Sequence, residues 1–177
     1  VRDSALVTRT IAGHDPRDAT SHPVEVPDFV AATCGDVRDM RIGIYGREFN
    51  PEFDEPIKLL LEELAKNGLG VSVYEDFAPF LVEKAGLDSD AARFTADSIE
   101  SIDLLISIGG DGSLLDTISI VRKSGVPILG VNTGRLGFLS NVGIDMITES
   151  VMALVDRAYT IDSRELIKVS GEGVDFG

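Results

Sequence analysis

Two kinds of hydrophobic pattern alternate along the chain from residue 40 onward. Short runs of apolar residues, typical of strands buried on both faces, are separated by longer segments whose apolar residues recur at helical spacing. The runs predict strands at 41–45, 71–74, 103–108 and 127–131. The longer segments predict helices at 54–68, 77–85, 90–98, 113–124 and 147–156, with Asp54 capping the first and Gly125 closing the fourth.

This alternation of strands and helices indicates an α/β fold, with a mostly parallel, Rossmann-like sheet covered by helices on both faces. We expect residues 40–158 to form this domain. Ligands of such folds bind outside the carboxyl ends of the strands. Two loops fall at such ends, the Gly-Gly-Asp-Gly turn at 109–112 and the Asn-Thr-Gly-Arg-Leu-Gly-Phe loop at 132–138.

The two ends of the chain depart from this pattern. Residues 1–39 show no sustained period of either kind, and Met40 is followed at once by the first strand. We therefore expect 1–39 to be a poorly ordered or non-native extension. Residues 159–170 read as extended chain with polar alternation. Because one strand cannot bury itself, its partners lie in the sheet or in residues that this chain does not contain.

Charge and composition narrow the classes of partner. The chain has 16 basic and 30 acidic residues and a net charge of −14, which disfavours nucleic acid and anionic membranes. No apolar stretch approaches the ~20 residues of a membrane-spanning helix, and no secretory signal is visible. Cys34 is the sole cysteine and cannot form an internal disulfide, so we expect a reducing, cytoplasmic location.

The set of reactive side chains is small after Met40. Neither His nor Cys occurs there, which excludes a Ser-His-Asp triad, a Cys-His pair and a Cys/His zinc site from this part of the chain. No residues are predicted to form a metal site. The remaining groups are carboxylates, backbone amides, Arg and Lys, which phosphoryl transfer uses for positioning and charge stabilisation.

The turn between the third predicted strand and the helix that follows it predicts a phosphate site. Gly109, Gly110 and Gly112 let a ligand approach the main chain closely. A helix that opens at Ser113 directs its unpaired N–H groups and its dipole to the same place. Asp111 would there accept a proton from an attacking hydroxyl or hold Mg²⁺. The alternative is structural, because tight turns also favour Gly and Asp.

Other residues of this helix have structural interpretations. Ser113 and Asp116 have the spacing of a capping box, so we expect Asp116 to brace the start of the helix. The apolar residues of the helix are expected in the core: Leu114, Leu115, Ile118 and Val121.

Four residues outside the turn are further candidates for ligand binding. Arg47, after the first strand, offers a cation to phosphate, and an exposed salt bridge is the alternative. Asn132 contacts a ligand or forms a turn. Leu136 and Phe138 are held between glycines beside the turn, where they face a planar base or are simply apolar.

The sequence from Ile108 to Ser140, in which GGDG is followed some twenty residues later by PILGVNTGRLGFL, resembles the NAD kinases. The resemblance extends from MRIGIYGR to SRELIKVSG and does not cover residues 1–39. It implies a nucleotide-binding α/β domain at 40–158, with 159–177 as the start of a truncated all-β domain. NAD would bind between the two domains. GGDG alone is shared with phosphofructokinases and with diacylglycerol and sphingosine kinases.

The resemblance also implies an activity. NAD kinases transfer the terminal phosphate of ATP, sometimes of polyphosphate, to the 2′-hydroxyl of the adenosine ribose of NAD, with a divalent metal such as Mg²⁺. Asp111 maps onto the proposed base and Gly112 onto the NAD site, and of the segment 136–139, Phe138 maps onto the adenosine pocket. The family is usually a homodimer or homotetramer.

The sequence departs from the family at two places. Many members have a basic residue five positions after the aspartate, where this chain has Asp116. The family's later NAD-contacting motifs, an Asn-Glu pair and a Thr-Gly-Ser-Thr-Ala-Tyr-like stretch, are absent. We therefore expect a fragment with little or no activity alone. The alternatives are another GGDG kinase, acting on a lipid or a sugar phosphate, and a non-catalytic nucleotide-binding module.

Overall fold

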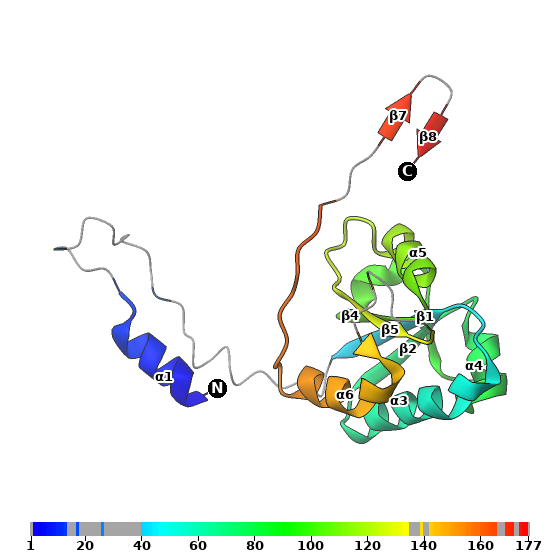
Figure 1. Ribbon diagram of the computed structural model, residues 1–177, viewed down its shortest axis with the longest axis horizontal. Helices are drawn as coiled ribbons and strands as arrows, with labels where there is room; N and C mark the ends of the chain where they lie inside the picture. Colours follow the sequence, from blue (N-terminus) through cyan, green and yellow to red (C-terminus); the bar gives the residue numbers. More distant parts are fainter. Residues whose placement is uncertain are drawn as a thin grey trace.

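The centre of the molecule is a six-stranded sheet in which all neighbouring strands run parallel. The computed structural model describes residues 2–13, 17, 26, 40–134, 139, 142–165, 169–171 and 174–176. The strand order is β3-β2-β1-β4-β5-β6 (Figure 1). The strands are β1 (Arg41–Gly46), β2 (Gly70–Tyr74), β3 (Ala92–Phe94), β4 (Leu104–Ile108), β5 (Ile128–Asn132) and β6 (Val142–Gly143).

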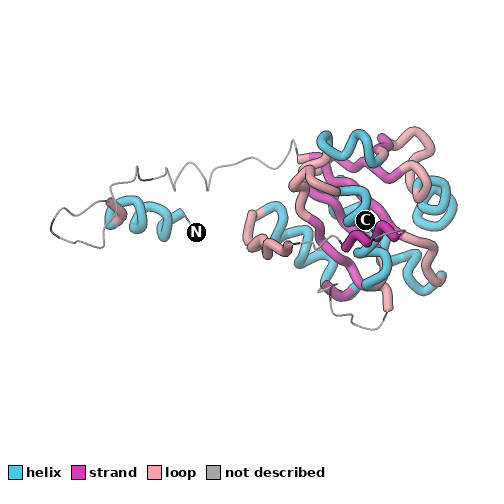
Figure 2. Tube along the Cα trace, turned by 90° about the horizontal axis from the view of Figure 1, so that it is seen from above, coloured by secondary structure: helices cyan, strands magenta, loops and turns pink. Residues whose placement is uncertain are grey.

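Helices cover both faces of the sheet, as Figures 1 and 2 show. On one face, α3 (Asp54–Lys66), α4 (Ala78–Ala85) and α6 (Ile147–Val155) pack against the strands in the larger of two buried clusters. On the other face, α5 (Asp111–Val121) and the 3-10 helix η2 (Ala96–Ser101) belong to the smaller cluster. The predicted α/β fold with helices on both faces is thereby confirmed.

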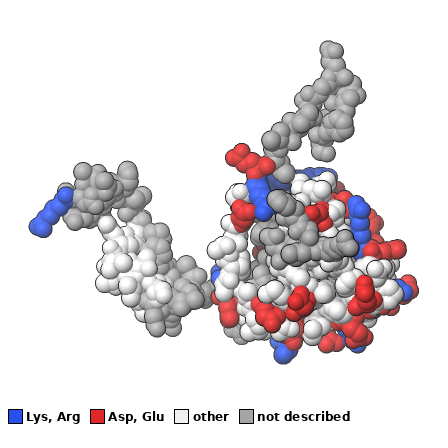
Figure 3. Space-filling view, in the orientation of Figure 1, with Lys and Arg blue, Asp and Glu red and all other residues white. Residues whose placement is uncertain are grey.

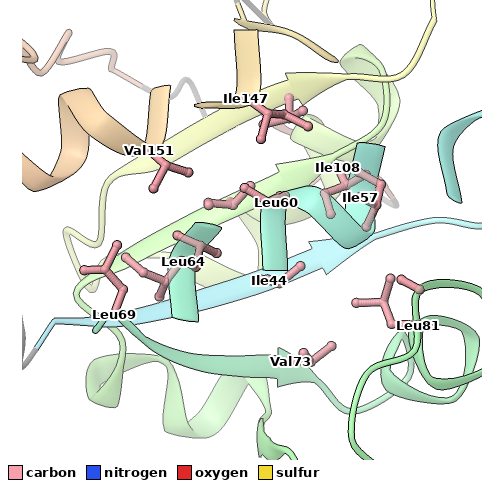
Figure 4. Close-up of a cluster of buried hydrophobic side chains, with 14 of the residues drawn as sticks. Ile44, Ile57, Leu60, Leu64, Leu69, Val73, Leu81, Ile108, Ile147 and Val151 are labelled. Atoms are coloured by element: carbon pink, nitrogen blue, oxygen red, sulfur yellow. The ribbon is translucent and has the colours of Figure 1, made fainter. Parts of the chain in front are cut away.

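The central strands supply both clusters because successive side chains of a strand point to opposite faces. In β4, Ile106 and Ile108 belong to the larger cluster and Leu105 to the smaller one. All five residues of β4 are buried, which explains its continuous apolar run. In Figure 4, Ile57 and Leu60 of α3 lie over the sheet among the buried side chains of the larger cluster.

The direction in which strands are added to the sheet reverses between β1 and β4. β2 and β3 extend the sheet on one side of β1, whereas β4, β5 and β6 extend it on the other. The chain leaves β1 toward α3 on one face and leaves β4 toward α5 on the opposite face. In open α/β sheets, such a reversal opens a crevice at the carboxyl ends of the two strands, where ligands bind.

The four predicted strands are confirmed to within one residue at each end, but the helix predicted at 90–98 is wrong. Ala92–Phe94 instead pairs with β2, and Phe94 is buried in the smaller cluster. Thr95 and Ser98 then form a capping box that begins η2. The pattern did not predict β6, which has only two residues.

Helix α5 also differs from its prediction. It begins at Asp111 with Gly110 as its N-cap, and no side chain caps it, so the predicted capping box of Ser113 and Asp116 is wrong. The core assignment of Leu115 is wrong as well, because this residue is 53% exposed. The buried residues of the helix are Ser113, Thr117, Ile120 and Val121.

Three elements of the described part of the chain belong neither to the six-stranded sheet nor to the helices that cover it. Helix α1 (Arg2–Ile11) falls in the segment where the pattern had indicated no regular element. β7 (Val169–Gly171) and β8 (Val174–Phe176) form an antiparallel pair. Within the residues described from 159 to 171, β7 is the only strand.

The surface carries the acidic charge of the sequence. In the view of Figure 3, Asp and Glu side chains are spread over the sheet domain. Among the described residues, no helix has the length and apolar character that crossing a membrane requires.

Candidate active site

The predicted site residues that the structure describes gather at the carboxyl edge of the sheet. Gly109 and Gly110 follow β4, and Asp111 is the first residue of α5. Arg47 follows β1, the neighbour of β4, and Asn132 ends β5 on the other side of β4. The turn and the candidate cation therefore lie at the crevice where the strand order reverses.

Gly109 is required by the fold itself. Its φ of +139° is in the range that strongly favours glycine, and a Cβ at this position would lie 2.8 Å from Cβ of Ser113. Two hydrogen bonds tie the residue to β5, because its N–H donates to the carbonyl of Val131 at 2.9 Å and its carbonyl accepts from the N–H of Thr133 at 3.4 Å. The start of the turn is thus fixed by backbone geometry.

Gly110 and Gly112 have no such structural requirement. A Cβ on Gly110 would meet nothing within 4 Å, and one on Gly112 would reach only Nη1 of Arg47, at 4.0 Å. Neither residue has a φ that excludes other amino acids. The two glycines therefore leave open space over the start of α5, as a ligand that approaches the main chain closely would need.

The start of α5 presents backbone N–H groups that the helix itself does not pair. The first helical hydrogen bond runs from the N–H of Leu114 to the carbonyl of Gly110, at 3.2 Å. The amides of the preceding helical residues have no partner within the helix, and the helix dipole adds partial positive charge at the same end. These features favour a bound anion such as phosphate.

Asp111 joins the turn to the second predicted loop. Its Oδ1 accepts a hydrogen bond from the N–H of Leu139 at 3.0 Å, across 28 positions of sequence. Leu139 is the described residue of the segment 135–141, and Leu136 and Phe138 lie outside the described residues. The contact brings the GGDG aspartate to Leu139, the last residue of the LGFL segment, which their sequence separation could not predict.

Asn132 has a structural role. It is 3% exposed, and its Oδ1 accepts a hydrogen bond from the N–H of Gly134 at 2.9 Å. This is the side-chain-to-backbone bond of an Asx turn, which shapes the loop after β5. The turn interpretation of Asn132 thus has direct support, and a contact between Asn132 and ligand stays a prediction.

Arg47 forms the exposed salt bridge that was its alternative interpretation. Its Nε and Nη2 donate to the two carboxylate oxygens of Asp116 at 2.7 and 2.9 Å. The hydroxyl of Tyr45 donates to the same carboxylate at 3.0 Å. The hydrogen bond from the guanidinium to Asp116 raises the pKa of Arg47, whereas burial, followed by the hydrogen bond to Asp116, raises the pKa of Tyr45.

The pairing of Arg47 with Asp116 explains why the predicted capping role of Asp116 is wrong. The carboxylate accepts hydrogen bonds from Arg47 and Tyr45 and caps no helix amide, and it holds the guanidinium with Nη1 4.0 Å from where a Cβ of Gly112 would lie. Arg47 keeps a 63% exposed side chain and so remains accessible to a ligand at the turn. Ser113 is different, because its side chain is buried beneath Gly109 and is 5% exposed.

A cavity of about 440 Å³ adjoins Arg47, and sequence reasoning did not predict it. Its wall includes three aromatic residues: Tyr45 and Tyr74, from the ends of β1 and β2, and Phe77, the N-cap of α4. The sequence feature that could have indicated this cavity is the tyrosine at the end of each of these two strands. A larger cavity of about 540 Å³ lies between α3 and the start of α6, and none of the predicted site residues lines it.

The carboxylates of the site take part in hydrogen bonds within the protein. In the parts of the chain with a described structure, no three His, Cys, Asp or Glu side chains are grouped so that they could hold an ion. Asp111 and Asp116 are both occupied with hydrogen bonds to other residues.

Known proteins match this chain over the same region. The family profile of the ATP-NAD kinase N-terminal domain matches residues 43–159. An NAD kinase of Flavobacterium psychrophilum is 35% identical over 132 residues, which make up 73% of this chain and 45% of that protein. The NAD kinase of Flavobacterium johnsoniae is 36% identical over 135 residues, or 75% of this chain and 46% of that protein.

A solved structure agrees on the fold. The crystal structure of yeast NADH kinase in complex with NADH covers 66% of this chain and 38% of its own, with a TM-score of 0.54 and 21% sequence identity. The chain spans somewhat less than half the length of the curated relatives it matches. Because the family profile covers about two thirds of the chain, from within β1 to the end of α6 and including the GGDG turn, this chain belongs to the ATP-NAD kinase family.

Proposed function

We propose that the protein is an NAD kinase, which transfers the terminal phosphate of ATP to the 2′-hydroxyl of the adenosine ribose of NAD and so makes NADP. The observation that carries this proposal is the open space over Gly110 and Gly112, at the start of α5 and beside Asp111. The fold does not need glycine at either position, whereas a phosphate chain held by the helix amides does. Family membership supplies the substrates.

The reaction divides among a few groups. The amides at the start of α5 and the guanidinium of Arg47 hold the phosphates, which stabilises charge in the transferred phosphoryl group. Asp111 orients the ribose hydroxyl and accepts its proton as the oxygen attacks the terminal phosphorus. The bond from that phosphorus to the bridging oxygen then breaks, and ADP leaves.

Asp111 acts chiefly by orientation. An unperturbed Asp has a pKa of about 3.9 and is a weak base at neutral pH. The hydrogen bond from Leu139 fixes one carboxylate oxygen at 3.0 Å, which holds the carboxylate in one position beside the turn. Proton transfer would then occur late, because the hydroxyl proton becomes more acidic as its oxygen forms the bond to phosphorus.

The remaining parts of the site come from the family resemblance. Leu136 and Phe138 line the adenosine pocket, Asn132 shapes the loop that presents them, and Mg²⁺ arrives with ATP. Residues 159–177 begin a second, β-rich domain. The protein works in the cytoplasm as a homodimer or homotetramer. Because this chain spans under half of its relatives, we expect it to have little or no activity alone.

A substrate panel tests the proposal. The polypeptide that the gene encodes in full is incubated with Mg²⁺ and ATP labelled in the terminal phosphate, and with NAD, fructose 6-phosphate or diacylglycerol as acceptor. Label is expected in NADP alone. Label in the sugar phosphate or the lipid, with none in NADP, would show that the site serves another GGDG-type kinase reaction.

A further inference from the structure

Asn132 is a buried amide at the end of β5, directly beside the GGDG turn. The other buried polar side chains in the described part of the chain are hydroxyls, those of Ser72, Ser107, Ser113 and Thr117. A buried amide costs free energy unless its polar atoms are hydrogen bonded. An Asx turn can form at the surface without this cost. The burial of Asn132 therefore indicates that its turn serves the structure around it.

The backbone on both sides of Asn132 is hydrogen bonded to Gly109. The N–H of Gly109 donates to the carbonyl of Val131 at 2.9 Å, and the N–H of Thr133 donates to the carbonyl of Gly109 at 3.4 Å. In a parallel ladder, a residue bonds in this way to the two neighbours of the residue opposite it. Asn132 therefore lies opposite Gly109, one residue beyond the last pair of the β4–β5 ladder.

The side chain of Asn132 fixes the direction of the chain as it leaves β5. Its Oδ1 accepts the hydrogen bond from the N–H of Gly134 at 2.9 Å, which closes the turn around Thr133. The N–H of Thr133 is thereby held toward the carbonyl of Gly109, to which its own hydrogen bond is long and weak. Without the side chain of Asn132, the turn would lose this closure. The position of Gly109, two residues before Asp111, therefore depends on Asn132.

The chain that follows β5 contacts the GGDG turn a second time, at Asp111. Leu139 donates its N–H to Oδ1 of Asp111 at 3.0 Å. Because only four residues separate Gly134 from Leu139, the position of one limits the position of the other. The turn is thus held at its first glycine and at its aspartate by the same stretch of chain, which Asn132 directs.

We propose that Asn132 is a positioning residue for Asp111. Its side chain closes the turn after β5, and this turn holds Gly109 and the N–H of Leu139 where they fix the carboxylate. The inference rests on the proposed function, in which Asp111 orients the ribose hydroxyl and accepts its proton. The effect of Asn132 on the rate passes through Asp111 and does not require a contact with a substrate.

Two substitutions and a matched control test the inference. Asn132→Ala removes the acceptor of the turn, whereas Asn132→Ser supplies a hydroxyl that forms the same kind of turn more weakly. The control is Ser124→Ala, because Oγ of Ser124 also accepts a hydrogen bond from the N–H two residues on, that of Val126, at 3.2 Å. Ser124 precedes β5 and lies at the opposite end of that strand from the GGDG turn.

The rate of NADP formation is measured in the polypeptide that the gene encodes in full, with NAD, ATP and Mg²⁺. We expect kcat to fall by at least about tenfold in Asn132→Ala, by less in Asn132→Ser, and not at all in Ser124→Ala. Combined with Asp111→Asn, Asn132→Ala should lower the rate further by less than about twofold, because residues that act as a unit have non-additive effects. An equally large loss in both backgrounds would overturn the inference, since Asn132 would then act independently of Asp111.

Amide hydrogen exchange tests the same inference without the reaction. In the 177-residue chain, Asn132→Ala should speed exchange of the Leu139 amide by at least about tenfold, because its hydrogen bond to Asp111 opens more often. Ser124→Ala should leave this rate unchanged. Asn132→Ser should give an intermediate rate, and it provides the comparison if the alanine variant does not fold.

The exchange rates separate this inference from the proposed function. An unchanged Leu139 rate in the Asn132 variants would overturn the inference, whether or not the protein makes NADP. Faster exchange in these variants, together with no NADP formation by the unmodified full-length polypeptide, would overturn the proposed function and still support the positioning of Asp111 by Asn132.

Discussion

At the scale of single residues, the glycines of the GGDG turn serve two different purposes. Gly109 adopts a φ of +139° and packs against Ser113, so the fold requires it. Gly112 lies in open space at the start of α5, and only Arg47 comes near it. Substitution at these two positions should therefore separate the stability of the turn from its affinity for nucleotide.

Gly112→Ala is expected to raise the free energy of unfolding by about 0.4–1 kcal/mol, because alanine restricts the unfolded chain and fits a helix. The same change should weaken ADP binding, since the methyl group occupies the space where phosphate approaches. Urea unfolding and calorimetric titration of the 177-residue chain measure the two effects.

Gly109→Ala is the matched control. It should lower the free energy of unfolding by about 1–3 kcal/mol, because its backbone conformation is strained for alanine. If Gly112→Ala destabilises the fold as much as Gly109→Ala does, then Gly112 is needed for the structure. The argument that its open space serves a ligand would then be wrong.

The contacts between distant residues could not be predicted from the sequence. Arg47 and Asp116 are 69 positions apart, and Asp111 and Leu139 are 28 apart. Helical spacing alone made a capping role for Asp116 the simplest interpretation. The fold overrides it because the end of β1 brings Arg47 and Tyr45 to the side of α5.

At the scale of elements, the strands were predictable and the exposed side of α5 was not. β4 is buried on both faces, so its apolar run is continuous and unambiguous. α5 is covered on one side only, and Leu115 faces solvent and is 53% exposed. A three-residue strand such as β3 is too short to show a period, and its pairing with β2 decides its conformation.

Truncation of one apolar residue in each element measures this difference. Ile106→Ala in β4 should lower the free energy of unfolding by about 2–5 kcal/mol, because Ile106 is fully buried between the sheet and its helices. Leu115→Ala in α5 should change it by less than about 0.5 kcal/mol. A loss at Leu115 as large as the loss at Ile106 would mean that another part of the protein covers this side of α5.

At the scale of the whole molecule, the net charge of −14 opposes the binding of phosphate, so the site depends on local donors. The helix start and Arg47 supply these donors at the crevice of the sheet.

Two tyrosines at the same crevice make the stability of the fold depend on pH. Burial raises the pKa of Tyr45 and of Tyr74, and nearby carboxylates add to the effect in both.

Stability is therefore expected to fall at alkaline pH. A raised pKa in the folded state stabilises the fold fully below the unfolded value of about 10 and is lost as the pH rises through the folded value. The midpoint of urea unfolding should decrease between pH 9 and pH 11, at about the pKa of tyrosine and above. Tyr74→Phe should show a smaller decrease, because the variant lacks one of the two ionising groups. An equal decrease of the midpoint in the variant would show that ionisation of Tyr74 does not contribute to the loss of stability.

The rate of NADP formation by the Asp111→Asn variant tests the central claim most directly. Asparagine keeps an oxygen that can accept the hydrogen bond from Leu139, so the turn should persist while the proton acceptor is lost. In the polypeptide that the gene encodes in full, with NAD, ATP and Mg²⁺, we expect kcat to fall by about 10²–10⁴-fold. ADP binding should stay unchanged, which shows that the site is intact. A variant that makes NADP at the rate of the unmodified protein would contradict the assignment of Asp111 as the catalytic residue.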